Sequence, residues 1–532
     1  MKIARIEIAR IHAGATDRFS AEMVGAKAAN LAHVAALGLP VPPAFVLPVG
    51  LCAAIVRGDA DAREGVADGL TEGMDFLQQA TGRIFGDRRR PLLVSVRSGA
   101  ARSMPGMLDT VLDVGCTAAA VRGLVRVTGH PRFASDCRRR FLESFGAVVL
   151  GIDPAVFKRR LDLFAANEGV ESAEMLDGEA LERLAESYCQ AIEDEECVVA
   201  DDPMEQLRAA TEAVYRSWVG ARAMTYRKLQ HLEDLPGTAV TVQAMVFGNS
   251  GTSSAAGVAF SRDPSTGAAK PVIDVLFASQ GEDVVSGRRN PQSEEAIVRS
   301  LPNVARQLRE ALARLEQEFG DVQDVEFTIE DGKLWILQTR AAKRTAQAAL
   351  RLAIDFVKEG RITPAEGLAR LNGIDLATIA STRLVDAGEP VARGTGASSG
   401  IAVGRAAFDP EAAERLAASG DPVVLVRSEI ATADVAGFAA SAGILTALGG
   451  RTAHAALVAR QLGKPCIVGC TALSLDEAGR SAHLAGQAVN EGEWLSIDGG
   501  SGAIYRGRGT VVTERPNAEL SQVKRWRAQS RH

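Results

Sequence analysis

One segment restricts the fold of this chain more than any other, because an apolar run in it ends in glycines and continues as a helix pattern. The segment is ILTALGGRTAHAALVARQLGKPCIVG, residues 444–469. The apolar run predicts a strand that ends at Gly449 and Gly450. The residues that follow recur at the spacing of one helix face, namely Ala455, Val458 and Leu462. The sequence therefore predicts a compact α/β unit around this segment.

Thr452 and His454 lie where this helix is expected to begin. Thr452 is a suitable N-cap residue, which puts His454 in the first turn, beside backbone N–H groups that have no partner within the helix. A helix N-terminus stabilises an added anion, and an imidazole has a pKa suited to nucleophilic use near neutrality. Two interpretations stay open here: a histidine that accepts a phosphoryl group, and a structural histidine at a helix start.

The N-terminal part of the chain alternates strand-like and helix-like stretches. Residues 24–48 predict a helix followed by a strand, and residues 91–107 predict a strand that opens into a small-residue loop. The pattern is helical over about 118–232. Strands then return and end in a β-hairpin at 323–340 with an Asp-Gly turn. This order predicts a mixed α/β fold.

Polar side chains stand on or beside several of these strands and loops. A nucleotide with Mg²⁺ requires cations for the phosphate oxygens and carboxylates for the metal, and this part of the chain offers both. Each residue alone is more often a solvated charge or a satisfied polar group, so only their joint placement favours a nucleotide site. The residues are Lys27, Arg97, Asp274, Gln280, Glu326, Gln338 and Arg340.

Two glycine-containing loops are weaker signals. The loop at 98–107, SGAARSMPGM, matches neither G-x-x-x-x-G-K-[ST] nor G-x-G-x-x-G. The loop at 248–257, GNSGTSSAAG, would cover phosphates with backbone amides or form a simple hairpin turn, and its composition favours the turn. Neither loop identifies an anion site by itself.

The composition disfavours several classes of function. Lys and Arg number 60 against 66 Asp and Glu, and aromatic residues make up 5%, so the chain has no basic field and few rings for nucleic acid. The seven cysteines are sparse and form no C-x-x-C pair, which indicates a reducing compartment. No window approaches the ~20 apolar residues of a membrane span. We therefore predict a cytoplasmic protein that binds neither nucleic acid nor membrane.

The length of 532 residues predicts about two to four domains. A helical stretch at 343–387 is expected to be a linker. The Pro-, Gly- and Ser-rich segment 389–400 is predicted to be a hinge. The α/β unit then occupies about 388–507, and the polar tail 508–532 is too short for a further domain.

Several segments, in this order along the chain, resemble the pyruvate, phosphate dikinase family of phosphoenolpyruvate-utilising enzymes. They are spread from about residue 24 to 507 and comprise GAKAANLAHVAALGLPVPPAFVL, PLLVSVRSGAARSMPGMLDTVLDVG, GTAVTVQAMVFGNSGTSSAAGVAFSRDPSTG, QGEDVVSG, QDVEFTIEDGKLWILQTRAAKRTA and GGRTAHAALVARQLGKPCIVG. The loop SMPGMLDTVLDVG is more similar to the dikinases than to the phosphoenolpyruvate synthases. That similarity implies inorganic phosphate as a co-substrate.

The resemblance implies an α/β protein made of two domains. An ATP-grasp nucleotide-binding domain would cover 1–342, including the helical insertion, and a swivelling phosphohistidine domain would cover 388–507. His454 would be the phosphorylated histidine, with Thr452 its neighbour in the motif. Arg340 would stabilise charge in the transition state, and Glu326 would bind Mg²⁺. The residues implied to hold ATP or phosphate are Lys27, Arg97, Gly106, Met107, Asp274, Gln280 and Gln338, with Asp274, where the family usually has Glu, as a metal or ribose contact.

Departures from the family's pattern bear on activity. Position 255 is Ala where dikinases usually have Gly in the second phosphate-covering loop, so ATP turnover is expected to be slowed. Ala453 replaces the usual Ser, which is a smaller change. The family's (β/α)₈ barrel, which binds pyruvate and phosphoenolpyruvate, needs about 250 residues, and the residues after 507 do not suffice for it. The chain is therefore expected to be a truncated form without that barrel.

Two functions remain at this point. One is an enzyme that passes the β-phosphoryl of ATP to His454, forms AMP and pyrophosphate, and delivers the group to an acceptor on another chain, such as a separate barrel subunit. The alternative is a catalytically weak nucleotide-binding or phosphohistidine subunit with a regulatory or partner role. The sequence leaves open the final acceptor, whether phosphate or water takes the γ-phosphoryl, and whether the chain is a homodimer.

Overall fold

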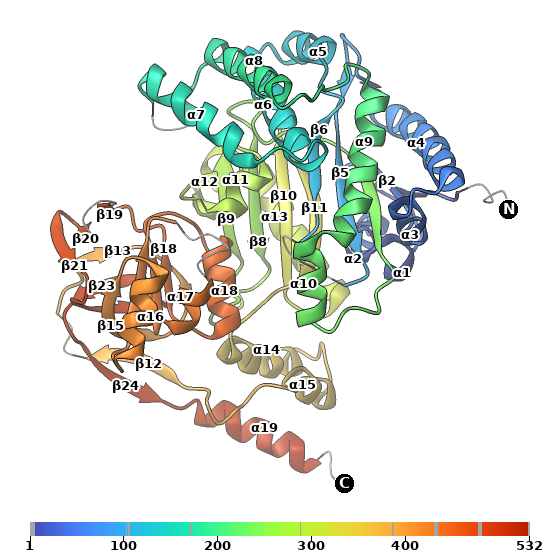
Figure 1. Cartoon of the computed structure of the whole chain (residues 1–532). Helices are drawn as coiled ribbons and strands as arrows, with labels where there is room; N and C mark the ends of the chain where they lie inside the picture. The colour runs from blue at the N-terminus through green and yellow to red at the C-terminus, as the bar shows by residue number, and fades with distance from the viewer. Residues whose placement is uncertain are drawn as a thin grey trace. The chain divides into compact units, whose positions relative to one another are not determined.

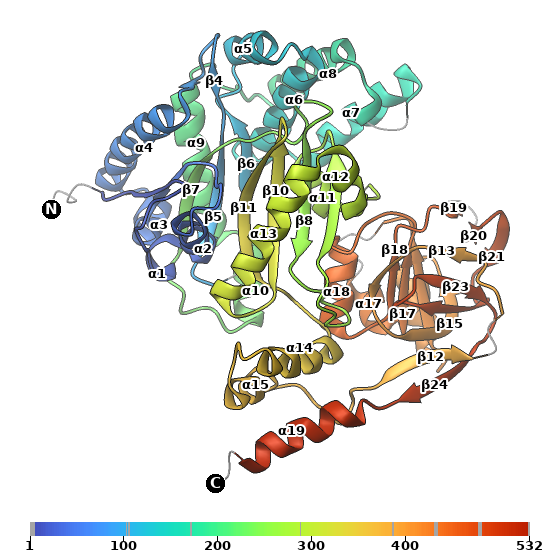
Figure 2. The same ribbon diagram turned by 180° about the vertical axis from the view of Figure 1, so that it is seen from behind.

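The computed structural model describes residues 6–102, 104, 107–170, 173–287, 289–385, 388–429, 435–476 and 481–529 (Figures 1 and 2). The chain divides into two units. The first is Met1–Thr252 with Trp335–Thr339, and the second is Ser253–Leu334 with Arg340–His532. Helices and strands alternate in both, so the predicted mixed α/β class is confirmed. No described helix is both long and apolar enough to cross a membrane.

The first unit is built on a five-stranded antiparallel sheet in the order β1-β2-β7-β5-β6. Its strands are β1 Ala9–Ile11, β2 Ala44–Leu47, β5 Val94–Ala100, β6 Thr110–Val114 and β7 Thr238–Ala244, and β3 Ile84–Phe85 pairs with β4 Pro91–Leu92. The inner faces of these strands carry apolar residues that share one core with the surrounding helices. The sheet therefore provides the rigid support for the loops that follow β5 and β7.

Ten α-helices belong to the described residues of the first unit. They are α1 Ala21–Val24, α2 Ala26–Ala36, α3 Cys52–Val56, α4 Ala60–Thr81, α5 Ala118–Thr128, α6 Pro131–Val148, α7 Pro154–Glu168, α8 Gly178–Asp194, α9 Pro203–Arg216 and α10 Ala221–Leu229. The stretch predicted to be helical, about 118–232, contains α5 to α10. Helices α5 to α8 gather at one end of this unit (Figures 1 and 2).

The N-terminal part of the second unit contains a four-stranded sheet in the order β11-β10-β8-β9. Its strands are β8 Ala255–Phe260, β9 Val272–Phe277, β10 Gln323–Glu330 and β11 Lys333–Ala341, and its helices are α11 Gly281–Ser286, α12 Glu294–Ser300 and α13 Pro302–Phe319. The turn between β10 and β11 is formed by Asp331 and Gly332, which have positive φ values of 48° and 74°. Asp-Gly suits such a turn because both central residues need φ above zero, and the predicted hairpin is confirmed.

An eight-stranded sheet forms the C-terminal part of this unit, in the order β13-β23-β22-β15-β16-β17-β18-β14. Strands β15 to β18 are parallel. Neighbouring residues of β17 pack into different cores, Ile444 into one and Leu445 into the other. The bounds are β13 Ala392–Arg393, β14 Thr395–Ser398, β15 Ile401–Ala407, α16 Pro410–Ala418, β16 Val423–Arg427, α17 Val435–Ala440, β17 Gly443–Thr446, α18 His454–Leu462, β18 Cys466–Val468, β22 Trp494–Asp498 and β23 Ala503–Arg506, with a small sheet of β19 Leu473–Asp476, β20 Ser481–Leu484 and β21 Gln487–Asn490 beside them.

The segment 389–400, predicted to be a hinge, contributes to this sheet. Strand β13 pairs with β23 and β14 pairs with β18. The backbone N–H of Val391 also donates to the carbonyl of Ile504 at 2.9 Å. Residues held by ladder hydrogen bonds cannot change their φ and ψ angles freely. A hinge would therefore lie outside the paired residues of this segment.

Two segments flank the eight-stranded sheet in the sequence. On the N-terminal side are α14 Ala346–Lys358, α15 Pro364–Arg370 and β12 Ser381–Val385, and on the C-terminal side are β24 Thr510–Glu514 and α19 Asn517–Gln529. β12 and β24 pair as an antiparallel ribbon. Val523 and Trp526 of α19 are buried against α14 and α15, and Figure 2 shows the three helices together. The polar tail is thus folded onto the linker helices over its described residues.

Candidate functional site

Helix α18 begins at His454, which is its first residue and therefore lies in the first turn, as predicted. The N-cap residue is Ala453, whose backbone is extended and whose side chain makes no capping bond. The prediction that Thr452 is the N-cap is wrong, because the Thr452 hydroxyl binds a carboxylate from another strand. The structure describes the backbone of His454, and its side chain lies outside the described part.

Asp274 of β9 binds the loop that leads into α18, residues 447–453, here called the α18 loop. Asp274 Oδ2 accepts hydrogen bonds from the backbone N–H of Thr452 at 3.1 Å and from its hydroxyl at 3.3 Å. Burial of the carboxyl group raises the pKa of Asp274, although Arg451 and the bonds from Thr452 act in the opposite direction. The observed partner of Asp274 is thus the α18 loop, and a metal or ribose contact stays a prediction.

Asn290 holds the same loop from a second position. Its Oδ1 accepts a hydrogen bond from the backbone N–H of Gly449 at 2.9 Å, and its Nδ2 donates to the carbonyl of Ala447 at 3.4 Å. A Cβ atom on Gly450 would lie 2.5 Å from Asp274 Oδ2, so only glycine allows this close approach. Sequence reasoning missed Asn290, because a single asparagine in a loop gives no periodic signal.

Arg340, Asp324 and Glu326 form a second polar group, here called the β10–β11 cluster. Arg340 Nε donates to Asp324 Oδ2 at 2.8 Å, and Arg340 Nη2 lies 3.9 Å from Glu326 Oε1. Asp324 is 3% exposed, and its burial raises the pKa of the carboxyl group more than Arg340 lowers it. Within the described residues, Asp324 Oδ1 has no hydrogen-bond partner.

The cluster brings together two predicted residues, Arg340 and Glu326, and adds one that sequence reasoning missed. A signal for Asp324 was present in the segment QDVEF, since Asp324 and Glu326 are two residues apart on a strand. Residues with that spacing share one face of a sheet. The alternation of two acidic residues with apolar ones would have identified the pair.

Lys27 and Arg97 lie on adjoining elements of the first unit. Lys27 is the second residue of α2, and Arg97 is in β5. A Cβ atom on Gly25 would lie 2.2 Å from the carbonyl oxygen of Gly99, so the start of α2 packs directly on β5. Arg97 Nη1 donates to Gln243 Oε1 at 3.5 Å. The fold therefore brings the elements that carry these two cations together.

The remaining predicted residues are dispersed. Gln338 is buried on β11, in the part of that strand assigned to the first unit. Met107 packs partly buried against the core of the first unit, and Gly106 lies outside the described residues. Gln280 is the N-cap of α11, where its side chain accepts from the N3 backbone and Asp283 reciprocates. In the structure, the Gln280 side chain therefore caps the N-terminus of α11.

Ala255 does not lie in a loop, so its predicted place in a phosphate-covering loop is wrong, while its effect on ATP turnover stays a prediction. Ala255 is the first residue of β8, fully buried, and pairs with Phe277 and Ile329. The loop before β8 is anchored near its start by Asn249, whose Nδ2 donates to Asp136 Oδ2 at 3.1 Å. Position 255 therefore acts on packing within the sheet.

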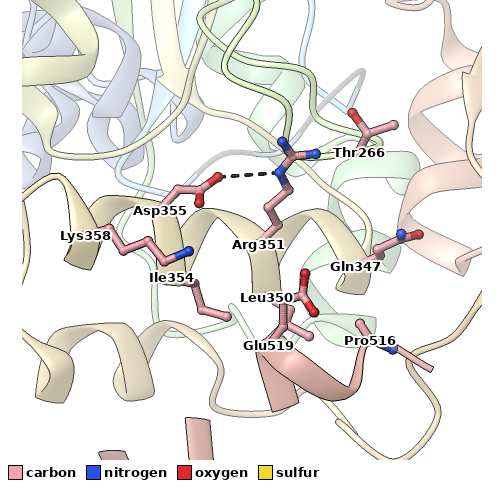
Figure 3. A pocket seen from close by; sticks show the side chains of 9 residues that line it. All are labelled: Thr266, Gln347, Leu350, Arg351, Ile354, Asp355, Lys358, Pro516 and Glu519. Atoms are coloured by element: carbon pink, nitrogen blue, oxygen red, sulfur yellow. Dashed lines mark hydrogen bonds and ion pairs between the residues drawn. The ribbon is translucent and has the colours of Figure 1, made fainter. Parts of the chain in front are cut away.

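A cavity of about 360 Å³ lies along α14 and the start of α19 (Figure 3). Arg351 Nε donates to Asp355 Oδ2 at 3.4 Å beside it. Its other lining residues are Thr266, Gln347, Leu350, Ile354, Lys358, Pro516 and Glu519. No predicted site residue belongs to this lining, so the α18 loop and the β10–β11 cluster remain the candidate site of the second unit.

Comparison with known proteins identifies both parts of the chain. Residues 62–307 and 293–360 match the family model "Pyruvate phosphate dikinase, AMP/ATP-binding domain". The chain belongs to the pyruvate, phosphate dikinase family. Residues 420–502, which include α18, match "PEP-utilising enzyme, mobile domain". The resemblance seen in the sequence is thereby confirmed, and the chain contains ATP-binding and phosphohistidine domains of the dikinase type.

Three curated relatives show how similar the sequences are and how much of each protein is covered. The chain is 40% identical to pyruvate, phosphate dikinase from Clostridium symbiosum over 493 residues, covering 91% of this chain and 56% of that protein. It is 40% identical over 532 residues to the enzyme from Rhizobium meliloti (strain 1021), covering 96% and 58%. The chloroplastic pyruvate, phosphate dikinase 1 of Arabidopsis thaliana is 39% identical over 509 residues, covering 95% and 53%. The chain spans about half the length of the curated relatives it matches.

The dikinase family is generally Mg²⁺-dependent, and the β10–β11 cluster fits that ion. Carboxylate oxygens are the ligands that Mg²⁺ prefers, and Asp324 Oδ1 and the Glu326 carboxylate stand on one face of β10. Among the residues that the structure describes, no group of three or more His, Cys, Asp or Glu side chains could hold a metal ion. Mg²⁺ is usually bound by one or two carboxylates together with substrate phosphates, and Asp324 and Glu326 would supply two carboxylates.

Proposed function

We propose that this chain is an ATP- and phosphate-dependent phosphotransferase in which His454 carries the phosphoryl group. The γ-phosphoryl of ATP passes to inorganic phosphate and gives pyrophosphate, the β-phosphoryl bonds to an imidazole nitrogen of His454, and AMP remains. The observation that carries the proposal is the α18 loop: Asp274 and Asn290 hold it, and it ends at His454 on the first turn of α18.

Charge complementarity supports roles for the other residues. Lys27 and Arg97 would bind phosphate oxygens of ATP, with Gln338, Met107 and Gly106 as further contacts. Arg340 would stabilise the negative charge that spreads over the transferring group, because phosphoryl transfer depends on positioning and charge neutralisation more than on covalent chemistry. Glu326 and Asp324 would bind Mg²⁺, which when present neutralises phosphate charge.

The acceptor is proposed to be bound by another chain. What supports this proposal is that the two matching family models are those of an AMP/ATP-binding domain and a mobile domain, over residues 62–360 and 420–502. Delivery would then require the mobile domain to carry the phosphohistidine away from the nucleotide. The pure chain should convert no pyruvate to phosphoenolpyruvate in the presence of ATP and phosphate. Measurable conversion would refute delivery to another chain.

The loading step is tested by labelling. The purified protein is incubated with ATP labelled in the β-phosphoryl, Mg²⁺ and phosphate, and acid-labile, base-stable label on the protein is measured. We expect labelling that disappears in His454→Ala and persists in the control His483→Ala, which changes an exposed histidine on β20. Absence of label from the wild type, with nucleotide binding intact, would leave only the binding or regulatory subunit as the function.

A further inference from the structure

Arg460 is a buried cation on the same helix as His454. It lies six residues after His454 on α18 and is 2% exposed, among the largest fully buried side chains of the chain. Its guanidinium stands 5.4 Å from the ring centroid of Phe260. Arginine is rarely buried completely unless it is paired, so this position requires an explanation.

The hydrogen bonds of Arg460 connect the α18 loop to the sheet. Arg460 Nη1 donates to the carbonyl of Arg451 at 2.8 Å and to the carbonyl of Ala397 on β14 at 3.0 Å. Arg451 adds a bond of its own, from Nε to the carbonyl of Gly396 at 3.1 Å. Arg451 is thus bound to β14 directly, through its own side chain, and indirectly, through Arg460. Both arginines therefore hold the start of α18 in place.

The rest of the guanidinium has no such partner. Arg460 Nε and Nη2 form no hydrogen bond within the described residues. Burial lowers the pKa of Arg460, and electrostatic interactions with Cys466 and with the carboxylates of Asp324, Asp274 and Asp263 act in the opposite direction. A buried donor without a partner costs free energy, and more so on a charged group. Anchoring of the loop by Nη1 alone does not explain why a full positive charge stands there.

Resting on the proposed function, we propose that Arg460 is a positioning residue for phosphorylation of His454: it anchors the α18 loop, and its charge offsets the negative charge that the phosphoryl group adds. The guanidinium lies beside the start of α18, because its Nη1 is 2.8 Å from the carbonyl oxygen of Arg451, three residues before His454. Even at a separation of about 10 Å, in a protein environment, one unit charge changes an equilibrium by roughly tenfold or somewhat more. The charge therefore favours the phosphorylated form without contact with the reacting atoms.

The test compares Arg460→Met, Arg460→Gln and Arg460→Lys with the wild type. The fraction of phosphohistidine is measured at equilibrium with fixed ATP, phosphate, AMP and pyrophosphate. We expect the equilibrium constant to fall by roughly tenfold in the Met and Gln variants, which lack the charge, and by less in the Lys variant, which keeps it. The matched control is Arg405→Met on β15, whose guanidinium binds Asp421 at 3.0 Å, and it should leave the equilibrium unchanged.

Further measurements keep the outcomes distinguishable. Hydrogen exchange of the backbone amides at 449–453 should be faster in Arg460→Met than in wild type and in Arg405→Met, while binding of a fluorescent ATP analogue should stay unchanged. If Arg460→Met does not fold, the Gln and Lys variants provide the same charge comparison. An unchanged equilibrium constant in both Arg460→Met and Arg460→Gln refutes the proposed role of Arg460 but does not affect the proposed function. A wild type that binds nucleotide but takes no label refutes the proposed function itself.

Discussion

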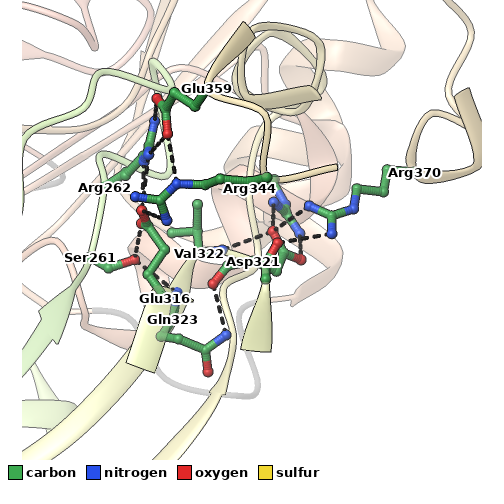
Figure 4. A network of polar contacts seen from close by, with 11 residues as sticks. Ser261, Arg262, Glu316, Asp321, Val322, Gln323, Arg344, Glu359 and Arg370 are labelled. Carbon is green, nitrogen blue, oxygen red and sulfur yellow. Dashed lines mark hydrogen bonds and ion pairs between the residues drawn. The ribbon is translucent and has the colours of Figure 1, made fainter. Parts of the chain in front are cut away.

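Two groups of arginine and carboxylate side chains in the second unit are built differently. The first, here called the linker cluster, consists of Arg262, Glu316, Glu359 and Arg361, and Figure 4 labels the first three. Arg262 donates to Glu316 and to Glu359 through bonds of 2.7, 2.8, 2.9 and 3.0 Å. The remaining oxygen of Glu316 accepts a bond of 2.7 Å from the hydroxyl of Ser261. Each carboxylate oxygen of Glu316 therefore has a partner.

The β10–β11 cluster is less completely paired. Arg340 makes one bond of 2.8 Å to Asp324 and only a long contact of 3.9 Å to Glu326. Within the described part of the chain, one oxygen of the buried Asp324 accepts no hydrogen bond. Both clusters combine arginine with carboxylates, but the linker cluster has two arginines for two carboxylates and the β10–β11 cluster has one arginine for two.

The two clusters differ in how completely their hydrogen-bonding groups are paired. In the linker cluster, Arg262 connects Glu359, at the end of α14, to Glu316 of α13, and both carboxylate oxygens of Glu316 are paired. In the β10–β11 cluster Asp324 Oδ1 has no hydrogen-bond partner within the described residues, and a metal ion with a phosphorylated ligand would use it. A saturated cluster is expected to matter for stability and an unsaturated one for chemistry, and substitutions in each test this difference.

The largest effect is expected from Arg340→Met. Loss of an arginine that stabilises a phosphoryl-transfer transition state lowers the rate by roughly 10³-fold or more. The rate of labelling of His454 from β-labelled ATP in a rapid-quench experiment measures this, with binding of an ATP analogue as the control for the nucleotide site. A labelling rate within tenfold of wild type would remove Arg340 from the chemistry and make the two clusters equivalent.

Arg262→Met should instead affect folding. It leaves the buried carboxylate of Glu316 without its main partner, and breaking a buried pair in this way costs about 3–5 kcal/mol. Urea unfolding followed by circular dichroism measures the loss. The matched control is Arg306→Met, which removes an ion pair to Glu310 with side chains 62% and 61% exposed and should cost less than about 1 kcal/mol. Equal losses in both variants would contradict the structural role of the linker cluster.

The pH dependence of stability should have opposite sign in the two clusters. The hydrogen bond from Arg262 lowers the pKa of Glu359 below its ordinary value of 4.5, so the stability it contributes is present above that value and is lost as the pH falls. Burial raises the pKa of Asp324 above its ordinary value of 3.8, so its contribution is present below that value and is lost as the pH rises.

Thermal unfolding of Glu359→Gln and Asp324→Asn between pH 3 and pH 8 therefore sharpens the comparison. Relative to wild type, the Gln variant should lose less stability on acidification, and the Asn variant should lose less as the pH rises from about 4. The wild-type curve measured in the same buffers is the reference. Slopes of the same sign would show that Asp324 is paired more fully than its single bond indicates.

The smallest effect is expected at the ribbon of β12 and β24. Arg383 Nε donates to Glu514 Oε1 at 3.0 Å, but the two side chains are 60% and 61% exposed. An exposed pair contributes about 0–1 kcal/mol, so Arg383→Ala should change the free energy of unfolding by no more than that. A loss close to that of Arg262→Met, measured in the same urea titration, would show that exposure does not decide which ion pairs matter here.

Local pattern alone predicted much of this molecule. The alternation of apolar residues predicted the hairpin at 323–340. The apolar run that ends in glycines predicted the strand before the α18 loop and the helix after it. These predictions held because they depend on neighbours within a few residues, as with the Asp331–Gly332 turn, whose positive φ values follow from its residue types. The position of His454 in the first turn of α18 followed in the same way.

Other properties were decided only by tertiary structure. Thr452 has the residue type of an N-cap but binds Asp274, which is 178 positions away in the chain. The segment 389–400 has a hinge-like composition, yet strands distant in sequence pair with it. Asn290 and Arg460 gave no signal at all. The sequence by itself determined which local conformations are favourable, whereas the partner of each polar side chain depends on which distant backbone the packed core brings within hydrogen-bond distance.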